Sequence, residues 1–373
     1  MKVGINATWL ATHTGGIRTY VRNLIRALAT VDPDSDYILY SNVPLPEAGL
    51  PDSTRMRRLI VRSGNRLLRI PFATSLALAR AGIDVVHEQI IAPFVFPSRI
   101  VVTVHDTLHE HYPDFYTPSA LRQLRLLMPI TMRRATAVLT DSEFCKREIV
   151  QLYRVPPEKV TAVPLAADPM FRRIHDETRI AAVRARYGTG ERFVLFTGSL
   201  KPTKNLKAVV EAYVRLRRAA AMQHRLVLVG DKAWVLDDIF ATARASGYAD
   251  EIIFTGHVAD EDLVALYNAA DLFVHPSLFE GFGLPPLEAM ACGTPVVTAN
   301  TSAIPEVVGD AALMVDPHDV EALASAIAMV LDDGALRARL SVQGLERAAS
   351  FSWEATARTI AGVYRDVVRA TRR

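Results

Sequence analysis

The segment 275–295, HPSLFEGFGLPPLEAMACGTP, carries the residues most suited to chemistry. A strand is expected to end near Ser277, and Pro285 is a favourable first residue for the helix that follows. The backbone N–H groups of residues 281–284 would then lie at a helix N-terminus. Free N–H groups and the helix dipole stabilise an anion such as a diphosphate at this position.

Two carboxylates, Glu280 and Glu288, flank this predicted anion site. Eight residues of continuous helix would separate them by about 12 Å. The paired acids of a retaining glycosidase lie roughly 5 Å apart, so these two acids are not expected to act on one bond. They are better suited to two parts of one long ligand, such as the hydroxyls of a sugar and of a ribose. Taken singly, each is better explained as a helix or loop carboxylate exposed to solvent, but the whole loop favours a ligand site.

Three further positions could complete such a site. Lys204 follows an expected strand end at 197–198 and begins a helix, where its charge opposes the helix dipole; a nearby diphosphate would explain it. His105 ends an apolar strand, at the edge of a parallel sheet where ligands bind. Gly15 and Gly16 form a loop that opens the first helix, with Thr14 as an expected N-cap. Each position also has an ordinary structural interpretation.

No metal site is expected. His105, His109 and His111 have a spacing that does not give a closed zinc geometry, and the Asp32-Pro33-Asp34 sequence is expected to be a polar turn. The first glycine loop lacks the Gly-x-Gly-x-x-Gly pattern of a dinucleotide site, which disfavours an NAD-dependent dehydrogenase.

Composition limits the remaining classes of protein. The chain has 373 residues, 50% of them hydrophobic, and a formal net charge of +3. Two domains of ordinary size are expected, and the small net charge disfavours a nucleic-acid-binding protein. No apolar run approaches the roughly 20 residues that span a bilayer, and the N-terminus does not have the pattern of a signal peptide. With Cys145 and Cys292 as the only cysteines, we expect a cytoplasmic protein without a disulfide framework.

Basic residues are concentrated in one segment. Residues 53–83 contain no Asp or Glu, and the stretch from Arg55 to Arg69 combines arginines with Leu67 and Leu68. A solvated basic face and peripheral binding to an anionic membrane, at its inner face, are both compatible with this pattern.

Short apolar runs alternate with helical periodicity along the whole chain, which predicts an α/β protein with parallel sheets. Strands are expected at 2–7, 37–41, 84–87, 100–105, 137–140, 160–165, 193–197, 226–230, 252–255, 272–275, 296–298 and 312–315. The pattern gives two doubly wound Rossmann-like domains that face each other across a cleft. We expect a first domain at 1–168, a second domain at 169–352 and a C-terminal helix at 353–373 that crosses back to the first domain.

The Glu280-x7-Glu288 arrangement resembles the motif of the family-4 retaining glycosyltransferases, which have the GT-B fold. The resemblance extends over essentially the whole chain. Its other segments are Gly15-Gly16-Ile17, His105-Asp106, Ser142-Glu143-Phe144, Val163-Pro164, Gly198-Ser199-Leu200, Lys204-Asn205 and Pro295-Val296-Val297. One difference is that many members carry an Arg where this sequence has Ser199 or Thr203, and Lys201 is a candidate substitute.

The resemblance implies that the first domain, 1–168, is the acceptor side and that the second, 169–352, binds the nucleotide sugar. It also implies roles for individual residues. Glu280 would hold hydroxyls of the donor sugar, Glu288 the nucleotide ribose and Lys204 the diphosphate, while His105 would approach the reaction centre. Further donor contacts are assigned to Gly15, Gly16, Ser199, Lys201, Gly230, Trp234, His257, Val258, Gly281, Phe282, Gly283 and Leu284. Attack from the same face as the leaving phosphate is implied, with no metal or other cofactor.

The chain is most similar to the mannosyltransferase-like branch that builds bacterial polysaccharides. The resemblance therefore implies transfer of mannose from GDP-mannose to a glycan or lipid-linked acceptor. UDP-sugar or dTDP-sugar donors, a related epimerase or phosphorylase, and a nucleotide-sugar-binding protein without turnover are the alternatives.

Overall fold

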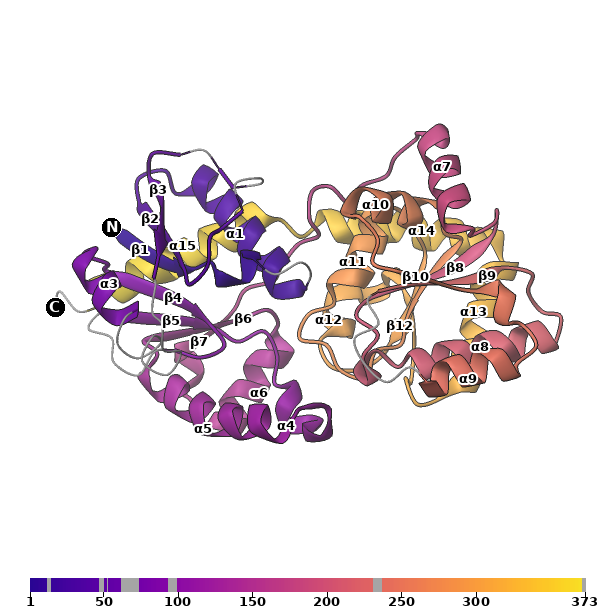
Figure 1. Cartoon of the computed structure of the whole chain (residues 1–373), viewed down its shortest axis with the longest axis horizontal. Helices are drawn as coiled ribbons and strands as arrows, with labels where there is room; N and C mark the ends of the chain where they lie inside the picture. The colour runs from indigo at the N-terminus through magenta and orange to yellow at the C-terminus, as the bar shows by residue number, and fades with distance from the viewer. Residues whose placement is uncertain are drawn as a thin grey trace. The chain divides into compact units, whose positions relative to one another are not determined.

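The computed structural model describes residues 1–11, 15–46, 50–51, 53–61, 74–92, 99–230 and 237–370. The chain forms two compact units, which Figure 1 shows from indigo to yellow along the sequence. Unit 1 comprises Met1–Leu165 and Ser352–Arg373, and unit 2 comprises Ala166–Phe351. These divisions fall a few residues from the boundaries expected at 168/169 and 352/353.

Unit 1 contains a parallel sheet with the strand order β3-β2-β1-β4-β5-β6-β7. Its strands are β1 (Lys2–Asn6), β2 (Asp36–Ser41), β3 (Met56–Ile60), β4 (Val85–Gln89), β5 (Arg99–Thr103), β6 (Ala137–Thr140) and β7 (Val160–Ala162). Its helices are α1 (Gly16–Val31), α3 (Thr74–Arg80), α4 (Leu108–His111), α5 (Pro118–Arg134), α6 (Glu143–Tyr153) and α15 (Trp353–Arg369). The order reverses between β1 and β4, as in a doubly wound Rossmann-like sheet.

The last helix, α15, completes unit 1. It packs on α1 and lies over β4, β5 and β6, with Trp353, Ile360 and Tyr364 among its buried residues. The expectation of a C-terminal helix that returns to the first domain is therefore confirmed. On the other face of the sheet, α5 and α6 contribute Met128, Met132 and Ile149 to a cluster of buried apolar side chains.

Unit 2 contains a parallel sheet with the strand order β10-β9-β8-β11-β12-β13. Its strands are β8 (Phe193–Thr197), β9 (Arg225–Val229), β10 (Ile252–Gly256), β11 (Leu272–His275), β12 (Val296–Ala299) and β13 (Leu313–Val315). Its helices are α7 (Glu177–Tyr187), α8 (Leu206–Arg218), α9 (Asp237–Ala245), α10 (Asp260–Ala269), α11 (Leu284–Ala291), α12 (Ile304–Val308), α13 (Val320–Asp332) and α14 (Gly334–Ala349).

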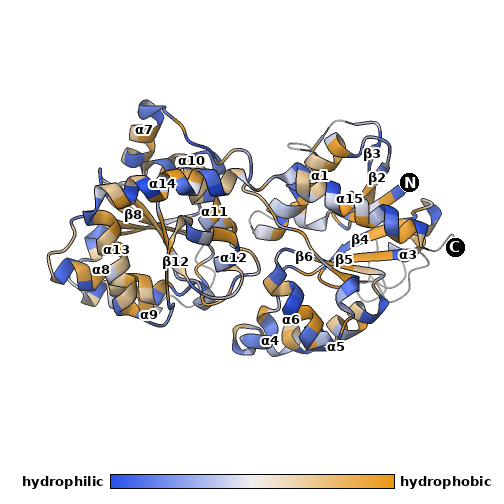
Figure 2. Ribbon diagram, turned by 180° about the vertical axis from the view of Figure 1, so that it is seen from behind, coloured by the Kyte–Doolittle hydropathy of each residue, from blue (hydrophilic) through white to orange (hydrophobic). Residues whose placement is uncertain are grey.

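Apolar strands lie between layers of amphipathic helices in both units. Figure 2 colours the strands largely orange, while the helices around them carry both orange and blue residues. Strand β8 is buried along its whole length, from Phe193 to Thr197, because helices cover both faces of a parallel sheet. The predicted α/β class with two Rossmann-like domains is confirmed.

Some predicted element bounds were wrong. Strand β5 ends at Thr103, so His105 lies in the loop beyond the strand, and β7 ends at Ala162 rather than at residue 165. Strand β3 was not predicted, because its sequence MRRLI was interpreted only as part of the basic segment. Asp32 lies at the C-cap of α1 and accepts a hydrogen bond from the Tyr37 hydroxyl at 2.6 Å, in agreement with a polar turn.

Among the residues that the structure describes, no helix combines the length and the apolar character needed to cross a bilayer.

Candidate functional site

The site in unit 2 lies where the order of the strands reverses. Strands β8 and β11 are neighbours in the sheet, and the connections on either side of them run in opposite directions. Ligands of doubly wound sheets bind in the crevice that this reversal creates beyond the carboxyl ends of the strands. Lys204 follows β8, and Glu280 follows β11, so the topology alone brings these residues to the same edge.

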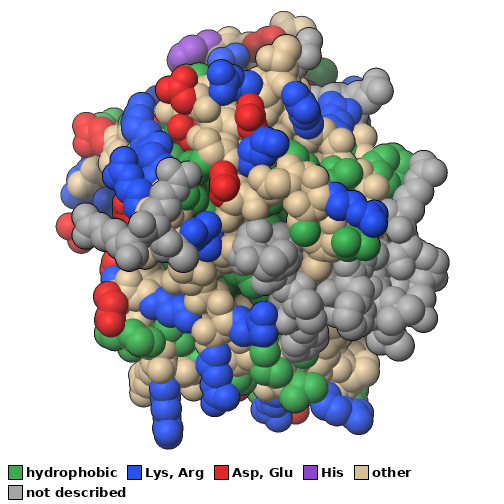
Figure 3. Space-filling model, turned by 90° about the vertical axis from the view of Figure 1, so that its left-hand side faces the viewer, with side chains coloured by type: hydrophobic (Ala, Val, Ile, Leu, Met, Phe, Trp, Pro, Cys, Tyr) green, Lys and Arg blue, Asp and Glu red, His purple; other side chains and the backbone are tan. Residues whose placement is uncertain are grey.

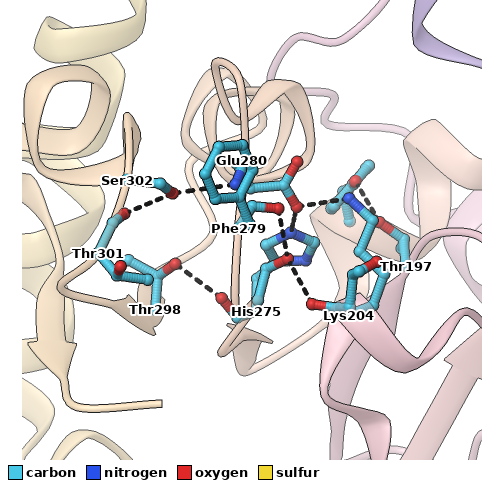
Figure 4. A network of polar contacts seen from close by, with 11 residues as sticks. Thr197, Lys204, His275, Phe279, Glu280, Thr298, Thr301 and Ser302 are labelled. Atoms are coloured by element: carbon cyan, nitrogen blue, oxygen red, sulfur yellow. Dashed lines mark hydrogen bonds and ion pairs between the residues drawn. The ribbon is translucent and has the colours of Figure 1, made fainter. Parts of the chain in front are cut away.

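Lys204 and Glu280 form an ion pair at this edge, 76 residues apart in sequence. The Lys204 Nζ lies 2.5 Å from Glu280 Oε1, and the two side chains are 18% and 12% exposed (Figure 4). Lys204 is the last residue of a 3-10 turn, Pro202–Lys204, that precedes α8. The Thr203 carbonyl accepts a hydrogen bond from the Leu278 N–H at 2.8 Å, which fixes this turn against the loop that carries Glu280.

His275, the last residue of β11, is the second partner of the same carboxylate. Its Nε2 lies 2.8 Å from Glu280 Oε1, and its side chain is fully buried. Burial lowers the pKa of His275, so the ring is neutral and donates its Nε2–H to the carboxylate. Burial alone would raise the pKa of Glu280, but Lys204 and the hydrogen bond from His275 hold it well below its usual range. The site therefore contains a permanent carboxylate.

Two residues in left-handed backbone conformations support the pair from either side. The Ser302 hydroxyl accepts a hydrogen bond from the Glu280 N–H at 2.9 Å, and Ser302 has a φ of 55°. Asn205, with the same φ of 55°, follows Lys204 and donates through its side-chain amide to the Pro317 carbonyl at 2.6 Å. Non-glycine residues rarely adopt this conformation, and such positions concentrate at functional sites.

The loop after Glu280 leads to the N-terminus of α11, as expected, with the first helical residue at Leu284. Gly283 is the N-cap residue with a φ of 116°, and a Cβ at this position would lie 2.7 Å from the Ile304 side chain. The ring of Phe282 is buried and contacts Phe351 edge-to-face. Gly281 to Leu284 are thus held in a conformation with backbone N–H groups at a helix N-terminus.

Glu288 lies on α11 and contacts the interior of unit 2. The buried Tyr267 hydroxyl donates to Glu288 Oε2 at 3.2 Å and lies 2.7 Å from the Thr197 hydroxyl at the end of β8. Burial raises the pKa of Tyr267 well above its ordinary value, so this phenol remains a donor. Through Tyr267, the half-buried Glu288 carboxylate lies near the carboxyl end of β8.

Glycines occupy the ends of three neighbouring strands in unit 2. Gly198 follows β8, Gly230 follows β9 and Gly256 ends β10. A Cβ at Gly230, where φ is 154°, would lie 1.9 Å from the Gly198 carbonyl oxygen. No side chain fits at Gly230, and the main chain itself forms this part of the edge.

The other residues assigned to the donor differ in their exposure. Ser199 and Lys201 are exposed beside the turn that carries Lys204, and His257 is exposed after β10. Val258 is buried, so its side chain is not available to a ligand. Trp234 lies outside the described residues.

In unit 1, the predicted residues lie on the loops after β1 and β5. Gly15 is the N-cap of α1 with a φ of 123°, and Gly16 is its first residue; both are exposed. Thr14, the expected N-cap, lies outside the described residues. His105 contacts Asp141 and Gln89 through its ring nitrogens, at 2.7 Å and 3.2 Å.

Sequence reasoning did not find His275, Ser302 or Tyr267, which position the two glutamates. His275 was the easiest of these to predict, because a histidine that ends an apolar strand just before the motif is a polar group at the ligand-binding edge. Within the described ranges, no three His, Cys, Asp or Glu side chains gather so that they could hold a metal ion. His109 instead contacts the Tyr153 hydroxyl at 2.9 Å, and His111 pairs with Glu148.

Comparisons with known proteins agree with this architecture. Residues 14–171 match the family model Glycosyltransferase Family 4, and residues 181–347 match Glycosyl transferases group 1. O-antigen chain mannosyltransferase B of Escherichia coli is 34% identical over 264 residues, which cover 70% of this chain and 69% of that protein. A serotype-specific mannosyltransferase of Escherichia coli is also 34% identical over 271 residues. The match covers 70% of this chain but only 32% of that longer relative.

Among solved structures, sucrose-phosphate synthase from Thermosynechococcus elongatus superimposes with a TM-score of 0.80 at 22% identity. The match covers 99% of this chain and all of that one, and at this identity it shows the fold alone. The family models, the relatives and the shared fold lead to one conclusion: the chain belongs to glycosyltransferase family 4, has the GT-B fold and is similar to the mannosyltransferases of that family.

Proposed function

We propose that this protein is a retaining, metal-independent hexosyltransferase that moves mannose from GDP-mannose to a glycan or lipid-linked acceptor in bacterial polysaccharide biosynthesis. The cluster of Lys204, Glu280 and His275 beside the N-terminus of α11 is the observation that carries this proposal. A cation, a permanent carboxylate and a row of backbone N–H groups are the groups that a sugar diphosphate requires.

The cluster supports a specific division of labour. Lys204 uses one of its three ammonium protons for Glu280, and the others are available to a diphosphate. Lys204 and His275 both contact Glu280 Oε1, which leaves Oε2 for hydroxyls of the donor sugar. Glu288, steadied by Tyr267, would hold the ribose of the nucleotide.

In this proposal, the main catalytic contribution is preorganised positive charge that the protein places beside the leaving diphosphate. As the bond between the anomeric carbon and the phosphate oxygen breaks, Lys204 and the N–H groups of residues 281–284 stabilise the charge that develops on the diphosphate. The acceptor hydroxyl forms the new bond from the same face and gives its proton to the departing phosphate oxygen. Transfer of radiolabelled mannose to an acceptor, with NMR of the product, tests both the activity and the α-configuration that retention requires.

The same assay separates the enzyme from a binding protein without turnover. An enzyme of this kind hydrolyses its donor slowly when acceptor is absent, so GDP accumulates from GDP-mannose. Binding of GDP-mannose without any release of GDP over many hours would favour the binding protein.

GDP is expected to stabilise the protein more than UDP, dTDP or ADP do. The relatives named as mannosyltransferases support this choice of donor, because mannose is commonly activated as GDP-mannose. Ligands that bind only the folded state raise the melting temperature with affinity, so thermal-shift titrations at equal concentration rank the four nucleotides. A larger shift with UDP or dTDP would replace GDP-mannose by a UDP-sugar or a dTDP-sugar.

Transfer is expected to continue in excess EDTA. The ammonium of Lys204 and the N–H groups at the N-terminus of α11 supply positive charge to the diphosphate without a divalent ion. Rates are compared with EDTA and with added magnesium or manganese. Complete loss of transfer in EDTA, with recovery on addition of one metal, would contradict the metal-independent mechanism.

Peripheral binding to the inner face of an anionic membrane through Arg55–Arg69 is a further part of the proposal. Arg57 and Arg58 are exposed on the edge strand β3, whereas Arg55 contacts Asp36 at 3.8 Å and so is partly neutralised. Figure 3 shows one face of the molecule, on which Lys and Arg side chains are spread among acidic and hydrophobic ones. The segment 62–73 lies outside the described residues.

Flotation with anionic vesicles at low salt is expected to recover more protein than flotation with neutral vesicles. Each basic residue near such a surface contributes about 1 kcal/mol, and salt screens the attraction. Substitution of Arg57 and Arg58 by Gln should reduce recovery. Equal recovery with both kinds of vesicle at low salt would show that these arginines form a solvated face.

A further inference from the structure

In unit 1, both ring nitrogens of His105 face oxygen atoms. Nδ1 lies 2.7 Å from Asp141 Oδ2, and Nε2 lies 3.2 Å from Gln89 Oε1. Gln89 ends β4, His105 follows β5 and Asp141 follows β6, so three neighbouring strands contribute to the arrangement. The side chains of His105 and Asp141 are 13% and 6% exposed, and Gln89 is buried.

A neutral imidazole has a single N–H group, so it can donate to only one of two oxygens. The other ring nitrogen would then place its lone pair against an acceptor. An imidazolium ion has two N–H groups and donates to both. We propose that Asp141 and Gln89 are positioning residues that hold His105 as an imidazolium ion at neutral pH.

The charges around His105 favour this form. The carboxylates of Asp141 and the adjacent Asp106 both favour a charged ring. Asp141 is nearly enclosed, and burial raises its pKa, whereas the charge and hydrogen bond of His105 act in the opposite direction. Burial, the largest single effect, lowers the pKa of His105, but the charge and hydrogen bond of Asp141, together with the charge of Asp106, outweigh it, and the pKa is raised. A buried carboxylate without a paired charge is unfavourable, so the proton on the ring also stabilises Asp141.

The other groups packed against His105 add no competing charge. Tyr20 on α1 contacts the ring edge-to-face with centroids 4.7 Å apart, and burial keeps its phenol protonated. His87 on β4 is fully buried between the Tyr364 and Thr103 hydroxyls, each 2.6 Å away, and burial lowers its pKa to about 3. On α6, the Cys145 thiol donates to the His105 carbonyl at 3.6 Å, and burial raises its pKa to about 12.

This inference rests on the proposed function for its consequence, since it specifies what His105 does in the transfer. An imidazolium ion supplies a fixed positive charge at the carboxyl edge of the unit 1 sheet, and it is unable to accept the proton of the acceptor hydroxyl. The departing phosphate must then be the base. Activity should be constant at neutral pH and should fall at alkaline pH, as His105 loses its proton.

Nitrogen-15 NMR of histidine-labelled protein measures the protonation state directly. In the full chain without donor, both ring nitrogens of His105 are expected to be protonated at pH 7, with the signal assigned by its loss in His105→Asn. A bare Nε2 at pH 7 would overturn the proposal. It would mean that the Gln89 amide is reversed and donates to a neutral ring.

Asp141→Asn should lower the pKa of His105 by about 1 to 3 units, because an opposite charge at contact distance is removed. The alkaline limb of the activity profile should move to lower pH by the same amount. If activity instead fell by the same factor at every pH, with no shift of the alkaline limb, Asp141 would have only a structural role, and the proposal would be contradicted. Gln89→Glu gives a second measurement, because a carboxylate opposite Nε2 should move the limb to higher pH.

Glu148→Gln is the matched control, since Glu148 pairs with a different histidine of the same unit, His111. It should change the signal of His111 and leave that of His105 in place. The NMR measurement needs neither donor nor acceptor. An imidazolium signal without transfer from GDP-mannose would therefore leave this inference intact and remove only the proposed donor.

Discussion

Glu280→Gln is expected to reduce transfer about 10²- to 10³-fold, the range found when one preorganised charged or polar contact is removed from a closed site. The amide has the same shape but no charge, so it neither neutralises Lys204 nor binds sugar hydroxyls as strongly. The loss should appear mainly in kcat, if the contact strengthens in the transition state. Initial rates of transfer with saturating donor give the comparison.

Glu321→Gln is the matched control, because Glu321 is 75% exposed and pairs with Arg215 on the surface. It should leave the rate unchanged. Near-normal turnover of Glu280→Gln with an unchanged melting temperature would show that the site lies elsewhere.

Acid titration of the same Glu280 variant provides a second readout. The folded state holds the pKa of Glu280 below its ordinary value, so its ionisation stabilises the fold above that value and this contribution is lost as pH falls. The difference in melting temperature between the natural protein and Glu280→Gln should therefore be largest above about pH 5 and should shrink as pH falls below about 4, toward the lowered pKa of the folded state.

Lys204→Ala is expected to weaken binding of the nucleoside diphosphate about 10- to 100-fold and to lower turnover as well. A hydrogen bond to a charged group contributes about 1.5 to 3 kcal/mol, and each 1.4 kcal/mol is a factor of ten. The variant also leaves Glu280 without its cation, which repels the incoming anion. Calorimetric titration with GDP and with guanosine separates the contribution of the diphosphate from that of the nucleoside.

Lys204→Arg retains the charge and should recover part of the affinity. Lys207→Ala is the control, since Lys207 lies on the exposed side of α8 and contacts Glu211 at 3.8 Å. Unaltered affinity of Lys204→Ala for GDP would remove Lys204 from the diphosphate site.

The strands of unit 2 were predicted to within about one residue, because each is a short apolar run with glycine, proline or a charged residue next to at least one of its ends. Strand β8, for example, is the run FVLFT between Arg192 and Gly198. Strand β3 was missed for the opposite reason. It is an edge strand with Arg57 and Arg58 exposed, and charged edges protect a sheet from pairing with another chain but remove the apolar pattern.

The site was predictable as far as motifs reach. Glu280, Glu288 and the N-terminus of α11 follow from spacing and from helix chemistry. The partners of these residues do not follow from the motif. His275, Ser302 and Tyr267 contact the glutamates because of the order of the strands and the path of the loops, which the motif does not specify. The contact between His105 and Asp141 likewise depends on β5 and β6 being neighbours.

The division of unit 1 into two stretches of sequence has a consequence for synthesis on the ribosome. Residues 1–165 are made before unit 2, but α15, which covers α1 and part of the sheet, is made after it. At about 5 to 20 residues per second, the intervening unit takes roughly 10 to 40 s to be translated. During this interval Tyr20 and His87 lack their contacts with Trp353 and Tyr364. Unit 2 is a single continuous stretch, so its translation is complete before that of unit 1. Unit 2 is therefore able to finish folding before unit 1.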